Sequence, residues 1–155
     1  MMNTAGKTRA SSEQVYVAEA RHQLFKVGFA RINDAIEHRY FLEAICLIES
    51  LLADRMESRT SDHVEAFSGF MNLGPLLKRL AACETDTRLR LLNQGVDRWR
   101  QSRNAIHEVM KIDAHHISPW PARVAQLRDS AIAGRKLLRA YDVAVRQARR
   151  RKEVA

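Results

Sequence analysis

The stretch that decides the fold is residues 39–58, RYFLEAICLIESLLADRMES, which has the clearest helical pattern in the chain. Its apolar residues recur every three or four positions, and such spacing places side chains on one face of an α-helix. Further apolar residues widen this stripe, as expected for a helix that packs on several sides. The stripe consists of Phe41, Ile45, Ile48, Leu52 and Met56. We therefore predict a helix that is buried inside a bundle.

Similar patterns on either side predict four more helices. They cover residues 13–37, a short segment from Pro75 to Cys83 that follows a break over 59–75, a long segment 87–111, and the C-terminal segment 122–150. The chain has only three prolines and six glycines, so few residues interrupt helices. Its 155 residues suit one domain. We predict an all-α, single-domain helical bundle of about four to six helices over residues 13–148, preceded by a disordered leader (1–12) and followed by a basic tail (149–155).

Nearly all of the excess positive charge lies at the C-terminal end. Residues 121–155 carry ten Lys or Arg and three Asp or Glu, a net charge of +7, whereas the first 120 residues carry a net +1. A concentrated basic segment favours a polyanionic partner, because neutralised phosphates release their counterions. The other interpretation is a solvated helix end that aids solubility. We expect RNA as the partner, bound by Arg146, Arg149, Arg150, Arg151 and Lys152.

Several classes of function find no support in the sequence. No apolar run has the length of a membrane span, and the first residues lack the apolar core of a signal peptide, so we expect a cytoplasmic protein without a membrane partner. Cys46 and Cys83 have no C-x-x-C partner and are interpreted as buried, reduced thiols. Asp113, His115 and His116 lack further residues at metal-ligand spacing. We expect neither a metal nor a cofactor, because glycine-rich phosphate loops are absent too.

The chemistry-bearing residues lie in the long helix, at residues 99–108, WRQSRNAIHE. Arg103 and His107 are four positions apart, Arg100 lies one turn before Arg103, and Asn104 lies beside it, so all four share one region of the helix surface. Arg103 occupies a position that continues the apolar series of this helix. A guanidinium there is costly unless it is paired or faces a cleft.

This set of side chains suits RNA cleavage by internal attack of the 2′-hydroxyl, a reaction that needs no metal. His107 is the expected general acid or base, since an imidazole titrates near neutrality. Arg103 is the expected stabiliser of the negative charge that develops on phosphorus, and Arg100 is the alternative. Asn104 can orient the imidazole or bind a phosphate oxygen.

The segment 99–111, WRQSRNAIHEVMK, resembles the motif helix of the HEPN superfamily (higher eukaryotes and prokaryotes nucleotide-binding domain). Residues 39–55 are similar to the acidic core helix of such proteins. The resemblance implies a small helical bundle, commonly a homodimer that joins two Arg/His motifs into one metal-independent ribonuclease site. Bacterial members often act as toxins or in phage defence, sometimes with a small nucleotidyltransferase as antitoxin. Other members have lost catalysis and serve as binding modules.

The family pattern is an Arg, four to six intervening residues and a His, commonly with Asn or another polar residue directly after the Arg. His107 matches it without ambiguity. Arg103 is followed by Asn104 but stands only three residues before His107, whereas Arg100 has six residues between and is followed by Gln101. The catalytic Arg is therefore either Arg100 or Arg103.

Two acidic residues of the 39–58 helix are candidates for supporting roles. The resemblance implies that Glu43 and Glu49 reach the site from the facing helix, where Glu49 would hold His107 or an Arg in place. A structural ion pair is the competing interpretation. In that case Arg103 is paired internally with Glu43 or Glu49, and the protein is a helical interaction module.

Overall fold

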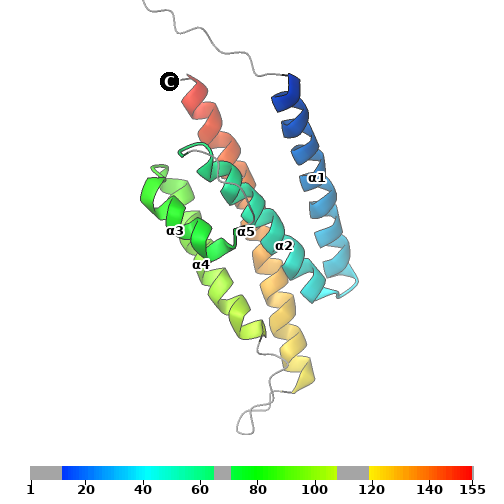
Figure 1. Ribbon diagram of the computed structural model, residues 1–155. Coiled ribbons are helices and arrows are strands. Elements are labelled where there is room, and N and C mark those ends of the chain that lie inside the picture. The colour runs from blue at the N-terminus through cyan, green and yellow to red at the C-terminus, as the bar shows by residue number, and fades with distance from the viewer. Residues whose placement is uncertain (1–11, 65–70, 108–118, 155) are drawn as a thin grey trace, which may run out of the picture.

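The computed structural model describes residues 12–64, 71–107 and 119–154, and in these ranges the chain forms five helices and no strand (Figure 1). The helices are α1 (Ser12–Glu37), α2 (Phe41–Thr60), α3 (Leu73–Cys83), α4 (Thr87–His107) and α5 (Trp120–Val154). The predicted all-α bundle of four to six helices is confirmed. The predicted leader falls on residues that, apart from Ser12, lie outside the described ranges.

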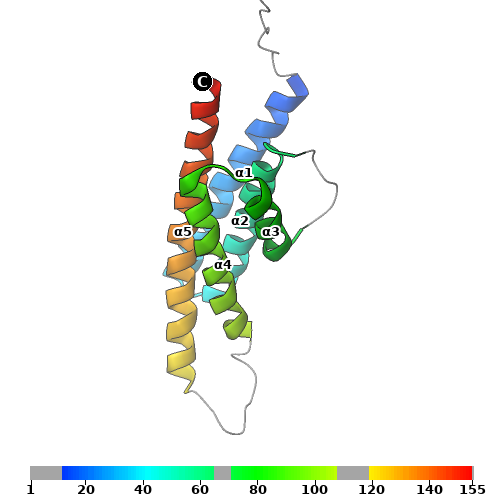
Figure 2. The same cartoon turned by 90° about the vertical axis from the view of Figure 1, so that its left-hand side faces the viewer.

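Helix α2 lies at the centre of the bundle and packs against α1, α3 and α5. Helix α5 also packs against α4. In Figure 1, α1 and α3 lie on opposite sides of the molecule. Figure 2 shows α5 and α3 on opposite sides as well. The predicted apolar stripe of α2 lies in the core of the bundle. All five of its residues are buried: Phe41, Ile45, Ile48, Leu52 and Met56.

Helix α4 approaches α5 closely at one glycine. A methyl group at Gly134 would lie 2.7 Å from the indole ring of Trp99, so only glycine leaves room for this ring. The Trp99 indole N–H donates a hydrogen bond of 2.9 Å to the carbonyl oxygen of Ser130. A large buried side chain with a directed hydrogen bond fixes the rotation of α4 about its axis. The side chains one turn later on α4 are oriented by this contact.

Helix α5 runs the whole length of the bundle. Its 35 residues span about 52 Å at roughly 1.5 Å per residue. The last turn of α4 and the first turn of α5 lie at one end of the molecule, and the last turn of α5 lies at the other (Figures 1 and 2). The helix includes residues 149–154 of the segment predicted as a basic tail, since it continues to Val154.

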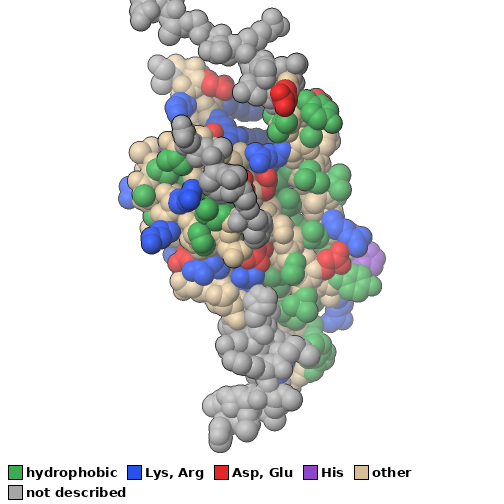
Figure 3. Space-filling model, in the orientation of Figure 1, with side chains coloured by type: hydrophobic (Ala, Val, Ile, Leu, Met, Phe, Trp, Pro, Cys, Tyr) green, Lys and Arg blue, Asp and Glu red, His purple; other side chains and the backbone are tan. Residues whose placement is uncertain are grey.

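Apolar side chains also occur on the surface, where they gather over α1 and the start of α2 (Figure 3). They include Tyr16, Leu24, Val27, Tyr40 and Leu42. None of the helices in the described ranges combines the length and the apolar character that a bilayer span requires.

Candidate functional site

Arg103 lies one turn after Trp99 on α4 and faces α2. Its Nη1 forms an ion pair with the Glu49 carboxylate, and its Nη2 donates a 3.3 Å hydrogen bond to the Asn104 side-chain oxygen. Its Nε is buried and has no hydrogen-bond partner among the described residues. The side chains of Arg103 and Glu49 are 15% and 26% exposed, so the pair is held in place but remains accessible from solvent.

His107 is the last residue of α4, and its side chain lies outside the described residues. Its backbone is helical and stands one turn beyond Arg103 on α4, the spacing of helical neighbours.

Arg100 has a different environment from Arg103. It donates hydrogen bonds of 3.2 and 2.8 Å to one oxygen of Asp97, on its own helix. It also extends toward α3, because a methyl group at Gly74 would lie 3.8 Å from its Nη1. The structure thus brings Arg103, Asn104 and Glu49 together and directs Arg100 to α3.

The two acidic residues of α2 also separate. Glu43 accepts a 2.8 Å hydrogen bond from Arg31 of α1, whereas Glu49 pairs with Arg103 of α4. Six residues along a helix correspond to about 9 Å and to a rotation of more than one turn. Glu49 is therefore the supporting residue of the Arg103 site, and Glu43 stabilises the packing of α1 on α2.

Two of the predicted RNA-binding arginines tie α5 to other elements. Arg149 pairs with Asp62 at 2.8 Å and donates to the carbonyl and hydroxyl oxygens of Ser58, at the end of α2. Arg151 pairs with Asp86 at 2.5 Å, just before α4. Their positive charges are largely compensated within the protein.

The remaining predicted RNA-binding residues are more open. Arg146 pairs with Asp142 on its own helix at 2.7 Å and is 53% exposed. Arg150 and Lys152 are exposed and form no ion pair with the described residues. Arg150 lies about 45 Å along α5 from Trp120, and thus far from the end of the bundle that carries the end of α4.

A buried ion pair at the C-terminal end of α2 was not predicted from the sequence. Arg59 donates hydrogen bonds of 2.7 and 2.8 Å to the two oxygens of Glu84, whose side chain is fully buried. Burial alone would raise the pKa of Glu84, but hydrogen bonds from Arg59 and the Asp86 amide outweigh burial and hold that pKa at about 2. Arg59 falls in the predicted break. For Glu84, the sequence offered only the observation that a charged residue stands in the short linker between two helices.

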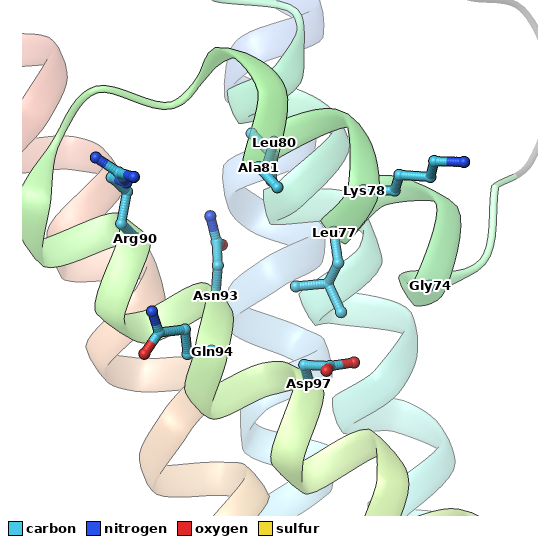
Figure 4. Close-up of a pocket in the computed structure, with 9 residues that line it drawn as sticks. All are labelled: Gly74, Leu77, Lys78, Leu80, Ala81, Arg90, Asn93, Gln94 and Asp97. Atoms are coloured by element: carbon cyan, nitrogen blue, oxygen red, sulfur yellow. The ribbon is translucent and has the colours of Figure 1, made fainter.

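A pocket of about 400 Å³ lies between α3 and α4 (Figure 4). Leu77 and Ala81 of α3 line one side, and Asn93 and Asp97 of α4 line the other. Asn93 is buried and accepts a 2.9 Å hydrogen bond from the Tyr141 hydroxyl, which fixes the orientation of the amide.

Two further donors border this pocket. Arg90 and Gln94 contribute side chains that form no ion pair or hydrogen bond with the described residues, whereas Lys78 points away from the pocket (Figure 4). The pocket thus combines an apolar wall with amide and guanidinium donors.

Comparison of the chain with protein-family models, with curated protein sequences and with solved structures finds no significant match. Within the described ranges, no three His, Cys, Asp or Glu side chains come together as a metal site. Asp113, His115 and His116 lie outside these ranges. What the protein does therefore has to be inferred from its own residues.

Proposed function

We propose that the chain is a metal-independent endoribonuclease of the HEPN type that acts as a homodimer. The observation that carries this proposal is the arrangement of Glu49, Arg103 and Asn104. A guanidinium is held at a position where an apolar residue would continue the core, one helical turn before a histidine. Arg103 also remains accessible to solvent, and its Nε has no partner among the described residues, so this guanidinium is not fully bonded within the protein.

The chemistry assigned to this arrangement is internal transesterification. The 2′-oxygen attacks phosphorus, the bond from phosphorus to the 5′-oxygen breaks, and the products are a 2′,3′-cyclic phosphate and a free 5′-hydroxyl. His107 transfers a proton to or from the reacting oxygens. Arg103 stabilises the additional negative charge on the phosphoryl oxygens, and Glu49 keeps the guanidinium in place.

The homodimer is implied by the HEPN resemblance, and the number of groups that the reaction requires agrees with it. One proton leaves the 2′-hydroxyl and another must reach the 5′-oxygen, so an acid and a base together serve best. The motif of one chain supplies a single histidine, and a second copy would supply the other. The HEPN resemblance supports this arrangement, together with a role as a toxin or phage-defence protein and a small nucleotidyltransferase as antitoxin.

The proposal is tested by incubating purified protein with mixed RNA in EDTA and separating the products on a gel. Wild-type protein should cleave, and His107→Ala and Arg103→Ala should not. Arg98→Ala is the matched control, because Arg98 is an exposed residue of the same helix that forms no ion pair with the described residues. Full activity in a folded His107→Ala protein would exclude this assignment.

The pocket between α3 and α4 favours a second candidate, a non-catalytic module that binds a nucleotide. Its oriented Asn93 amide and the unpaired Arg90 and Gln94 side chains could bind the base edge and the phosphate of such a ligand. Calorimetric titration with AMP and GMP tests this function. Binding that Arg90→Ala weakens, without any RNA cleavage by the wild type, would favour the module over the nuclease.

A further inference from the structure

We propose that the phosphate backbone of RNA binds in a basic groove between α1 and α5, and not along the C-terminal tail. We call this surface the α1–α5 groove and define it by its five cationic residues, Lys26, Arg135, Lys136, Arg139 and Arg146. That RNA is the polyanion rests on the proposed function, whereas the groove itself is a feature of the structure.

The groove consists of two adjoining hollows. Their volumes are about 310 and 460 Å³, and both are lined by Phe29, Asn33 and Arg139. Together they follow the surface along the middle of α5, between residues 132 and 146. Each hollow is in the size range of small-ligand pockets, so the groove has depth as well as charge.

The charges of the groove are mostly uncompensated. Among the described residues, Asp142 is the only carboxylate that lines it, and Asp142 also pairs with Arg55 and Arg146. Lys26, Lys136 and Arg139 form no ion pair with the described residues. Five cations against one carboxylate give the groove a strongly positive potential, which is what a polyanion requires.

Two side chains hold the cations over the groove. Arg139 lies 4.9 Å above the centre of the Phe29 ring, a cation–π distance, and Arg135 donates a 3.0 Å hydrogen bond to Asn33. Neither contact neutralises the positive charge. Both guanidiniums are therefore positioned in advance and remain fully charged, which reduces the entropy lost on binding.

The spacing of the cations suits a nucleic-acid strand. Arg135, Arg139 and Arg146 follow one face of α5, and from the first to the last they span about 17 Å at roughly 1.5 Å per residue. A stacked strand places one phosphate about every 3.4 Å, so this face covers about five phosphates. An isolated phosphate group would need only one of these cations.

The position of the groove also fits the proposed function better than the tail. Ile132, at the lower end of the groove, lies about 18 Å along α5 from Trp120, whereas Arg150 lies about 45 Å away. The end of α4 lies at the same end of the bundle as Trp120 (Figure 2). Measured along α5, a strand in the groove is thus nearer to the level of the end of α4 than a strand on the tail would be.

The test measures binding separately from cleavage. The probe is a short, fluorescein-labelled single strand of 2′-O-methyl RNA, which lacks the 2′-hydroxyl and cannot be cleaved by internal attack. Its affinity is measured by fluorescence anisotropy over a series of salt concentrations. The groove variant is Lys136→Glu with Arg139→Glu. The matched control is Arg150→Glu with Lys152→Glu, which changes the net charge equally, on exposed residues of the same helix.

The groove variant should bind at least about tenfold more weakly and show a smaller salt slope, since each lost phosphate contact on a single strand reduces the slope by roughly 0.7. The control should change the affinity less than about twofold, because its residues lie outside the groove. Equal losses in both variants, a larger loss in the control, or no RNA binding at all would overturn the inference. Circular dichroism checks folding, and Lys26→Glu with Lys136→Glu replaces the first variant if Arg139→Glu unfolds.

Two further outcomes separate this inference from the proposed function. Loss of binding in the groove variant, without cleavage of unmodified RNA by the wild type, would support the groove and contradict the nuclease. Cleavage by the wild type, with an unchanged KM in the groove variant, would support the nuclease and contradict the groove. Binding to anionic lipid vesicles but not to RNA would assign the groove to a membrane surface and overturn the inference.

Discussion

Two of the arginine–glutamate pairs that hold α2 to its neighbours differ in how completely the arginine is used. At one end of α2, the three side-chain nitrogens of Arg59 are bonded to Glu84 and Asp62, and the side chains of Arg59 and Glu84 are 6% and 0% exposed. Further along, Arg103 has a buried Nε without a partner among the described residues, and its pair with Glu49 is accessible. The first pair is buried and has every guanidinium nitrogen bonded, so it stabilises the fold. The second is accessible to solvent, and the remaining N–H groups on Nη1 and Nη2 of Arg103 can bind a ligand.

The largest expected effect is on the Arg59–Glu84 pair. Arg59→Ala should lower the free energy of unfolding by about 3–5 kcal/mol, because Glu84 would remain charged and buried without its main partner. Urea denaturation followed by circular dichroism measures this loss. Arg31→Ala is the control, since its pair with Glu43 is exposed and should contribute far less to stability. Equal losses in the two variants would contradict the distinction.

Arg103→Ala should have its main effect on activity. Removal of one stabilising donor should reduce cleavage about 100- to 1,000-fold. The loss in stability should be only about 1–2 kcal/mol, as for one hydrogen-bonded group at an accessible site. Rates on a defined RNA and urea denaturation of the same samples give both values. A loss in stability as large as that of Arg59→Ala, with no change in cleavage, would make Arg103 a structural residue of a helical interaction module.

A change at the Gly134–Trp99 contact should affect the Arg103–Glu49 pair more than the Arg59–Glu84 pair. Gly134→Ala places a methyl group against Trp99 and should cost about 1–3 kcal/mol, the usual effect of overpacking. It should also reduce cleavage, because Trp99 fixes the rotation of the helix that carries Arg103. Ala133→Gly, at the exposed neighbouring position, controls for changes in helix propensity. Unchanged stability and cleavage in Gly134→Ala would show that the close contact is dispensable.

The smallest effect, counted per pH unit, is expected on the acid side of the stability curve. The pKa of Glu84 is about 2 in the folded protein, below the ordinary value of 4.5, so its contribution to stability is complete above pH 4.5 and is lost as the pH falls toward 2. In that window, the unfolding free energy of the wild type should fall more steeply than that of Glu84→Gln, by at most about 1.4 kcal/mol per pH unit. Identical slopes would contradict the assigned pKa.

Local sequence patterns were enough to predict the helices. The periodicity of residues 39–58 predicted α2, which the structure places at Phe41–Thr60, and the start of α4 at Thr87 agrees with the prediction. The C-terminal helix was predicted over residues 122–150 and extends two residues further at its start and four at its end. Ends of helices depend on tertiary contacts, such as the pair of Arg151 with Asp86, which a local pattern does not contain.

The site could be predicted only in part, because pairing across helices depends on rotation about each axis. The position of Arg103 in an apolar series indicated a paired or cleft-facing guanidinium, and Glu49 was one of two candidate partners. The choice between Glu43 and Glu49 depends on the packing of α1, because Arg31 of α1 donates a hydrogen bond to Glu43. The α1–α5 groove could not be predicted, since it joins residues that are about a hundred positions apart in the chain.

The placement of both arginine–glutamate pairs on α2 has a consequence for local opening of the molecule. Amide hydrogens around Arg59 lie beside a fully buried carboxylate, and they should exchange with deuterium only when the whole bundle unfolds. Amide hydrogens near Arg103 lie at the last turns of α4, beside an accessible pair, and should exchange through smaller and more frequent openings. The C-terminal end of α2 should thus stay closed, whereas the last turns of α4, which pair with the middle of α2, should open without loss of the fold.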